Sequence, residues 1–150
     1  MVKILFLLVA VFVSMQPAQA ASEAECAIWL CLPAGFPSGC SDAHSAFRDR
    51  IRHLRPPLPP IMSCVVGADS SGMSSDYGVA AIIGASRRCV ETGVYDRTEC
   101  VRSETVPETY VKGTACRHSD GGESPLGCIR TGHYIDVFVE GNRVGDTYVW

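Results

Sequence analysis

Eight cysteines constrain the fold of this 150-residue chain more strongly than any other feature. An even number of cysteines in an exported chain is typical of a disulfide framework. Four bridges would each contribute roughly 2–4 kcal/mol, which offsets a modest hydrophobic core. We therefore predict that all eight are bridged: Cys26, Cys31, Cys40, Cys64, Cys89, Cys100, Cys116 and Cys128.

The N-terminal segment, residues 1–20, predicts export. Lys3 precedes an apolar run from Ile4 to Val13, and Ala18-Gln19-Ala20 matches a signal-peptidase site. An uncleaved membrane anchor is the alternative, which the shortness of the apolar run disfavours. We expect cleavage after Ala20, a periplasmic location, and a single disulfide-rich domain over residues 21–150.

The formal net charge of −3 at pH 7 bears on the class of partner. A nucleic-acid-binding protein usually carries a broad basic surface, which a mildly acidic chain does not supply. We therefore expect no direct contact with nucleic acid, and membrane contact only through the signal peptide before its cleavage.

A first short helix is predicted from Ser22. Ser22 and Glu25 have the spacing of a capping box, in which each side chain bonds the backbone amide of the other residue. The apolar residues 27–30 follow, and Pro33 and Gly35 end the helix.

A second helix is predicted after the turn-forming residues 32–39, with Ser41 or Asp42 as its N-cap. Residues 22–55 would then form a helical hairpin, and the proline-rich residues 56–60 would end it as a stiff spacer. Four apolar side chains form one stripe along the second helix: Ala43, Phe47, Ile51 and Leu54.

Sequence alone does not select among the roughly 105 possible pairings of eight cysteines. An antiparallel helical hairpin brings the end of its first helix close to the start of its second, and short loops elsewhere favour local pairs. The pairs that we favour are Cys31–Cys40, Cys26–Cys64, Cys89–Cys100 and Cys116–Cys128.

Residues 61–150 are predicted to be rich in β-structure. Residues 67–78 have loop composition, and the apolar residues 79–85 could be a buried strand or a short helix. Residues 109–116 predict a strand, and residues 120–125 predict a turn.

Two strands, 134–140 and 144–150, are predicted to pair around a two-residue turn at Gly141-Asn142. The predicted fold class is therefore α+β: a disulfide-linked N-terminal helical hairpin followed by a small antiparallel β meander.

The register of this strand pair requires an irregularity. Ile135 would face Tyr148, but Val137 would face Asp146, which opposes an apolar side chain to a charged one. A bulge at Gly145 would resolve the mismatch, because glycine inside a strand often marks a bulge.

The residue patterns of common active sites and metal sites are weak here. No C-x-x-C motif occurs, and a catalytic Cys–His pair needs an unpaired cysteine. The nearest approach to a zinc site is the set Cys116, His118, Cys128 and His133, whose thiols an oxidising compartment would bridge. We expect no catalytic residues, no metal and no other cofactor.

Two stretches carry a resemblance to a known family. They are ECAIWLCLPAGFPSGCSDAHSAF, followed by a Pro/Leu/Pro segment and Ser-Cys, and the C-terminal CRH…GCxRT…YIDVFVEG…VGDTYVW, so that the resemblance runs from Cys26 to Trp150. The chain resembles small exported proteins that are encoded in plasmid conjugal-transfer regions and are often named TraL. The resemblance implies a periplasmic accessory of a conjugative type IV secretion apparatus.

The resemblance leaves other functions open. The same family name is given in some systems to a cell-wall transglycosylase, so an envelope enzyme acting on cell wall is the alternative. An exclusion or regulatory factor at the membrane surface is another. A glycan-cleaving enzyme needs paired carboxylates, and the capping role of Glu25 already explains the best-placed acid.

We expect the protein to act by binding envelope proteins of a conjugation apparatus through its helical hairpin. Aromatic side chains often anchor interfaces, so Trp29, Phe36 and Phe47 are candidates if they are exposed, and core residues otherwise. The basic side chains Arg48, Arg52 and Arg55 are a second candidate surface, with a solvated helix face as the alternative.

Overall fold

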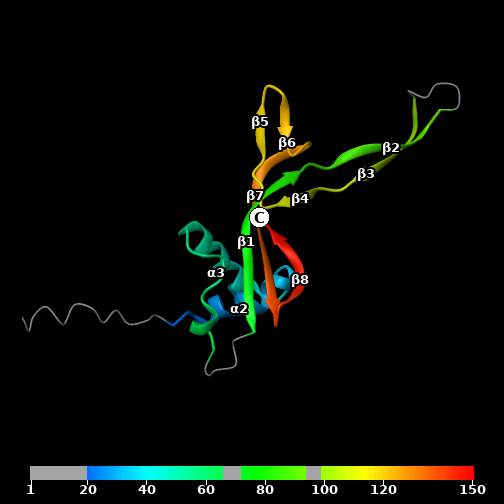
Figure 1. The fold of residues 1–150 in the computed structure, drawn as a ribbon. Coiled ribbons are helices and arrows are strands. Elements are labelled where there is room, and N and C mark those ends of the chain that lie inside the picture. Colours follow the sequence, from blue (N-terminus) through cyan, green and yellow to red (C-terminus); the bar gives the residue numbers. More distant parts are fainter. Residues whose placement is uncertain (1–19, 66–71, 94–98) are drawn as a thin grey trace, which may run out of the picture.

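The computed structural model describes residues 20–65, 72–93 and 99–150, so the predicted signal peptide lies outside the described residues apart from Ala20. Two helices are followed by antiparallel β-strands, which confirms the α+β class (Figure 1). Within these described ranges, no helix is long and apolar enough to cross a membrane.

The helical hairpin consists of α2 (Glu23–Cys31) and α3 (Ser41–Arg52), joined through the 3₁₀ turn η1 (Leu32–Ala34). The predicted capping box is present, with Ser22 and Glu25 each accepting from the other's amide at 3.2 Å. The N-cap prediction for α3 was wrong. Cys40 occupies that position because it is bridged to Cys31 and its carbonyl accepts from the His44 amide at 2.9 Å.

Leu54 does not belong to the apolar stripe of α3. The helix ends at Arg52, and the Arg55 amide turns back onto the Arg50 carbonyl at 2.9 Å. Leu54 therefore adopts a left-handed backbone with φ of 53° and is 94% exposed. Ala43 and Phe47, by contrast, are buried as predicted.

Four of the strands form one antiparallel sheet in the order β4-β1-β7-β8. Its members are β4 (Thr109–Lys112), β1 (Met73–Ile83), β7 (Cys128–Val139) and β8 (Asn142–Val149). Two further hairpins project from one end of this sheet (Figure 1). They are β2 (Ser86–Thr92) with β3 (Cys100–Val106), and β5 (Arg117–Ser119) with β6 (Gly122–Ser124).

The prediction of a loop over residues 67–78 was wrong from Met73 onward. Residues 73–78 form the first half of β1, and residues 79–83, which were ambiguous, form its second half. Pairing with β7 extends from Met73–Val139 to Ile83–Cys128, so long-range hydrogen bonds override loop-like composition. Residues 66–71 lie outside the described part.

Two other predictions differ from the structure in their bounds. The strand predicted over 109–116 ends at Lys112, because Gly113 has φ of +72° and turns the chain. The turn predicted over 120–125 is shorter, since residues 122–124 already form β6.

The β7–β8 hairpin confirms the predicted pair Ile135–Tyr148, while its turn is Glu140-Gly141, one residue earlier than predicted. The register shifts between Ile135 and Val137, whose partners are Tyr148 and Val144. The extra residues lie on β8 and include Gly145, as the predicted bulge required.

The core lies between the helical hairpin and one face of the sheet. Ile28, Leu32 and Phe47 of the helical part cluster with Ile135 and Val137 of β7. A smaller cluster of Ala80, Ile82 and Tyr134 lies on the opposite face, since neighbouring side chains alternate along a strand. The helices cover only part of the sheet (Figure 1).

All four favoured pairings are present as disulfides: Cys26–Cys64, Cys31–Cys40, Cys89–Cys100 and Cys116–Cys128. The first two hold the helical hairpin, and the other two lie at the projecting β-hairpins. Such a set of bridges indicates an oxidising, extracytoplasmic compartment.

Candidate docking groove beside helix α3

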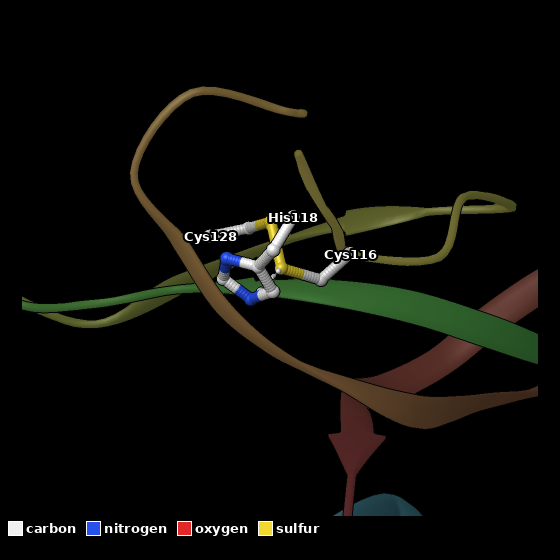
Figure 2. A group of neighbouring side chains, drawn as sticks. All are labelled: Cys116, His118 and Cys128. Carbon is white, nitrogen blue, oxygen red and sulfur yellow. Dashed lines mark hydrogen bonds between the residues drawn. A yellow bond between two sulfur atoms is a disulfide. The ribbon is translucent and has the colours of Figure 1, made fainter. Parts of the chain in front are cut away.

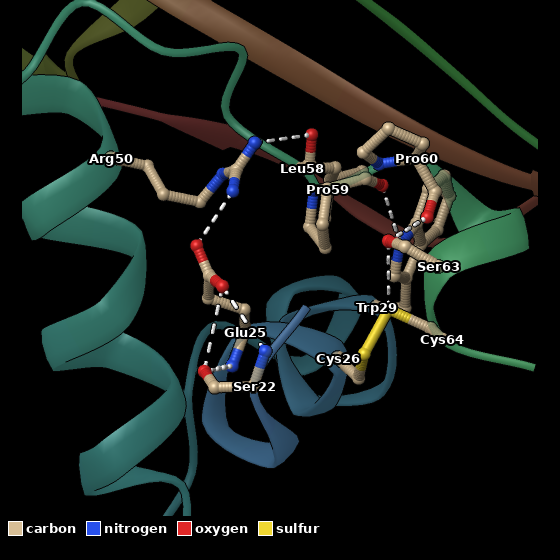
Figure 3. The surroundings of a disulfide bond; sticks show 10 residues. All are labelled: Ser22, Glu25, Cys26, Trp29, Arg50, Leu58, Pro59, Pro60, Ser63 and Cys64. Carbon is tan, nitrogen blue, oxygen red and sulfur yellow. Dashed lines mark hydrogen bonds and ion pairs between the residues drawn. A yellow bond between two sulfur atoms is a disulfide. The ribbon is translucent and has the colours of Figure 1, made fainter. Parts of the chain in front are cut away.

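The aromatic residues predicted as interface candidates lie mostly in the core. Trp29 is 6% exposed and Phe47 is 2% exposed, so the condition of exposure is not met for either. The Trp29 indole donates to the Pro59 carbonyl at 3.1 Å (Figure 3). Phe36 is half-buried and meets Phe47 and Tyr148 at ring-centroid distances of 5.5 and 5.3 Å.

The predicted arginines differ in their surroundings. Arg48 and Arg52 are exposed on α3. The Arg55 side chain pairs with Glu25 at 3.3 Å and with Asp49 at 2.5 Å, so part of its charge is satisfied internally.

Two adjoining hollows share Ile51 and Trp150 and together form a groove between α3 and the sheet. Their volumes are about 340 and 300 Å³. We call this the Trp150 groove. The larger hollow is lined by Ile51, Leu54, Arg55, Pro56, Pro57, Tyr77, Gly78, His133 and Trp150. The smaller is lined by His44, Phe47, Arg48, Ile51, Arg52, Tyr148 and Trp150.

Trp150 continues β8 and is held in register by two backbone hydrogen bonds with His133, each 3.0 Å long. Its indole stacks with the His133 ring at a centroid distance of 5.5 Å and meets Phe47 edge-on at 5.3 Å. The sheet thus places one aromatic side chain at the junction of the two hollows.

The rim of the groove exposes apolar surface. Leu54 is 94% exposed, Tyr77 is 50% exposed and Val79, the next residue outward on the same face of β1, is 38% exposed. These side chains gather where the helices stop covering the sheet, and grouped exposed apolar side chains are typical of interaction sites.

The groove is also electropositive. Among the described residues, its lining includes three arginines, two histidines and no carboxylate side chain. Burial raises the pKa of the Tyr148 hydroxyl, while the positive charge of Arg48 acts in the opposite direction. This combination of guanidinium groups and aromatic rings suits a ligand that is acidic and partly apolar.

Among the described residues, the carboxylates whose pKa is shifted, Glu25 and Asp136, lie outside the Trp150 groove. A hydrogen bond from Arg50 holds the pKa of Glu25 below its ordinary value. Burial alone would raise the pKa of Asp136, but hydrogen bonds from Lys112 and Thr147 outweigh it and lower that pKa. Both groups are held ionised, whereas a general acid requires a raised pKa.

The four residues that came nearest to a zinc site in the sequence do not lie together in the structure. His133 lies in the Trp150 groove. The other three residues, Cys116, His118 and Cys128, lie together at the base of the β5–β6 hairpin, with both cysteines bridged (Figure 2).

The sequence predicted the arginines of the Trp150 groove but not most of the aromatic side chains that line it. The missed side chains are Tyr77, His133, Tyr148 and Trp150. Alternation from the buried Ile135 could have placed His133 on the helix-facing side, and the predicted pair Ile135–Tyr148 could have placed Trp150 beside it.

Comparison of the chain with protein-family models, with curated proteins and with solved structures finds no match.

Proposed function

We propose that this protein is a non-enzymatic periplasmic accessory of a conjugative DNA-transfer apparatus. It acts by binding a segment of another envelope protein in the Trp150 groove. The observation that carries this proposal is the meeting of Arg48, Arg52 and Arg55 with a partly exposed indole and an exposed Leu54 in one groove.

The occupant is an extended acidic segment with an aromatic or aliphatic side chain. Its carboxylates would pair with the guanidinium groups of α3, and its apolar side chain would lie against Trp150. Arg48 and Arg52 form no ion pair within the described part of the chain, so their full charge is available to the partner. Arginine and aromatic residues are also the residue types that dominate interface energetics.

Three observations support the wider assignment. The four bridges fit an oxidising compartment. The predicted signal peptide fits export to the periplasm. The resemblance, which runs from Cys26 to Trp150 and is weaker over residues 67–88, supplies the conjugation context.

A charge reversal tests the groove in cells. We expect Arg48→Glu with Arg52→Glu, introduced on the conjugative plasmid itself, to lower transfer frequency at least about tenfold, which corresponds to about 1.4 kcal/mol of binding. The matched control is Arg87→Glu with Arg88→Glu, which reverses two exposed arginines on β2. Normal transfer by the groove variant, at normal protein level, would contradict the proposal.

A binding measurement on the purified protein tests the groove independently of the role in conjugation. A peptide of alternating glutamate and phenylalanine should change the fluorescence of Trp150 in a Trp29→Phe background, which removes the buried indole. The charge-reversed groove should lose this response. Peptide binding without any transfer defect would retain the groove and reject the conjugation role.

The cell-wall alternative has a separate test. Purified protein should leave the turbidity of peptidoglycan unchanged; the pKa values of Glu25 and Asp136 are lowered, whereas a general acid needs a raised one. If the protein is instead an exclusion factor, the charge-reversed variant should change transfer when it is present in the recipient cell and not when it is present in the donor.

A further inference from the structure

We propose that the Cys116–Cys128 bridge is one state of a redox-controlled zinc site. When a dithiol reductant opens the bridge, the thiolates of Cys116 and Cys128 and the imidazole of His118 bind one Zn²⁺ ion. Two thiolates and one imidazole form a donor set typical of protein zinc sites.

The three donor atoms are already close together. The sulfur atoms of Cys116 and Cys128 and a ring nitrogen of His118 lie within 4.8 Å of one another. The His118 Nε2 atom is 3.4 Å from the Cys116 sulfur, and Figure 2 shows the imidazole ring beside the bridge. Around one tetrahedral ion with zinc bonds of about 2.0–2.3 Å, donor atoms lie about 3.5–3.8 Å apart. The distance from His118 to Cys116 already fits this value, and the two sulfur atoms move apart when their bond is broken.

The backbone holds these residues independently of the disulfide. The Cys116 amide donates to the Thr131 hydroxyl at 2.9 Å, and that hydroxyl donates back to the Cys116 carbonyl at 3.4 Å. Cys128 begins β7, pairs with Ile83 of β1 and donates its amide to Pro125 at 3.1 Å. Opening the bridge therefore leaves these contacts of both cysteines in place.

The redox step is a two-electron exchange. The dithiol transfers two electrons and two protons to the bridge, the sulfur–sulfur bond breaks, and the reductant becomes a disulfide. Zinc then displaces one proton from each thiol, because the metal binds thiolates. A water molecule completes the tetrahedron, since three protein ligands leave one position open.

The surroundings of Cys116, His118 and Cys128 suit a zinc site. Cys128 is buried, Cys116 is half-buried and His118 is exposed, so one edge of the site faces solvent. Glu123 stands directly opposite His118 in the β5–β6 ladder. Directly opposed side chains share a face of the hairpin, so the Glu123 carboxylate is placed to orient the imidazole.

The second projecting hairpin provides a natural comparison. Its Cys89–Cys100 bridge spans 11 residues, against 12 for Cys116–Cys128, and its sulfur atoms contact the carbonyls of Glu91 and Arg102. The remaining three histidines of the chain are engaged elsewhere: His44 with Phe36, His53 with Asp49, and His133 with Trp150.

The test compares the two hairpins within one molecule. The protein is purified in oxidised form, reduced with a phosphine that adds no thiol ligand, and mixed with Zn²⁺ before alkylation of its thiols. We expect one bound zinc by native mass spectrometry. Alkylation of Cys116 and Cys128 should slow at least tenfold, while that of Cys89 and Cys100 should not change.

A single substitution checks the role of the imidazole. His118→Ala should raise the zinc concentration needed for protection at least about tenfold, in line with the loss of a ligand. His53→Ala is the matched control, because His53 is exposed on α3. Equal protection of all cysteines, an absence of bound zinc, or normal affinity in His118→Ala would each overturn the site.

Discussion

Arg50 is the buried charge that joins three segments of the helical half. Its side chain donates to the Glu25 carboxylate at 2.7 Å, to the Pro56 carbonyl at 2.8 Å and to the Leu58 carbonyl at 3.2 Å. Figure 3 shows the contacts with Glu25 and Leu58. The proline-rich segment is thereby held against α2 and α3.

Replacing Arg50 with alanine should be strongly destabilising. The change removes the buried charged partner of Glu25, which keeps the Ser22 amide and the partly exposed Arg55, and it leaves two carbonyls without their donor. We expect this to cost about 3 kcal/mol. Urea unfolding measures the loss. Arg52→Ala, on the exposed side of the same helix, should change the free energy of unfolding by less than about 0.5 kcal/mol.

The residues of the Trp150 groove were predictable from the sequence to different extents. Arg48 and Arg52 were found because the helical period places them beside an apolar stripe, which is local information. Trp150 and Tyr77 come from β8 and β1, whose positions depend on pairing with β7. Such long-range neighbours are absent from any short sequence window.

At the scale of elements, the bulge in β8 connects the sheet to the helical hairpin. Gly145 has φ of +71°, and a Cβ atom there would lie 2.1 Å from the Pro33 carbonyl oxygen in η1. The sheet and the hairpin therefore meet at a position without room for a side chain.

Gly145→Ala should cost about 3 kcal/mol, since it adds a backbone clash to the strain of a left-handed alanine. The matched control is Gly141→Ala, where φ is +79° but nothing lies within 4 Å of the added carbon. The control should cost only about 1–2 kcal/mol. Similar melting temperatures for the two variants would contradict this account of the contact.

The β2–β3 hairpin stands apart from both hydrophobic clusters. Every residue of β2 is exposed, and β3 is exposed up to Thr105. An isolated two-stranded hairpin is marginally stable in water, so the Cys89–Cys100 bridge must supply much of its order.

Removing that bridge should loosen the hairpin alone. In Cys89→Ser with Cys100→Ser, the amides of residues 86–92 and 100–106 should exchange with solvent deuterium at least tenfold faster, while those of β1 and β7 keep their protection. Hydrogen exchange by mass spectrometry resolves the two regions. Equal loosening of β1 would show that the hairpin supports the sheet.

The elements themselves were predictable to different extents. The helical hairpin was predicted from capping and turn signals that lie between Ser22 and Cys64, and its two bridges agree with the pairings favoured there. The start of β1 was missed because Ser74, Ser75, Asp76 and Gly78 give it the composition of a loop, and it gains its structure from pairing with β7. Local signals predicted the existence of both helices, whereas the extent of the strands depends on the strands with which they pair.

At the scale of the whole molecule, the two faces of the sheet are stabilised differently. One face meets the helices through apolar side chains. The opposite face carries Asp136, which is 3% exposed and bonds with Lys112 and with the Thr147 hydroxyl, the latter at 2.6 Å. The Tyr134 hydroxyl on this face donates to Asp76 at 3.0 Å, which raises the pKa of that tyrosine.

This layout makes stability sensitive to acid on both sides of the sheet. The pKa values of Glu25 and Asp136 are lowered in the folded state. Unfolded carboxylates titrate near pH 4, so below about pH 5 the unfolded chain takes up protons first and the free energy of unfolding falls. That loss continues until the folded-state values are passed.

Urea unfolding at pH 7, 5, 4 and 3 should therefore show a steep decline in stability below pH 5. Glu25→Gln and Asp136→Asn should each be less stable than the natural chain at pH 7, because Arg50 or Lys112 loses its ionic partner. Each should also show a shallower decline, because one carboxylate no longer differs in proton uptake between the two states. An unchanged slope in both variants would mean that acid acts through other groups.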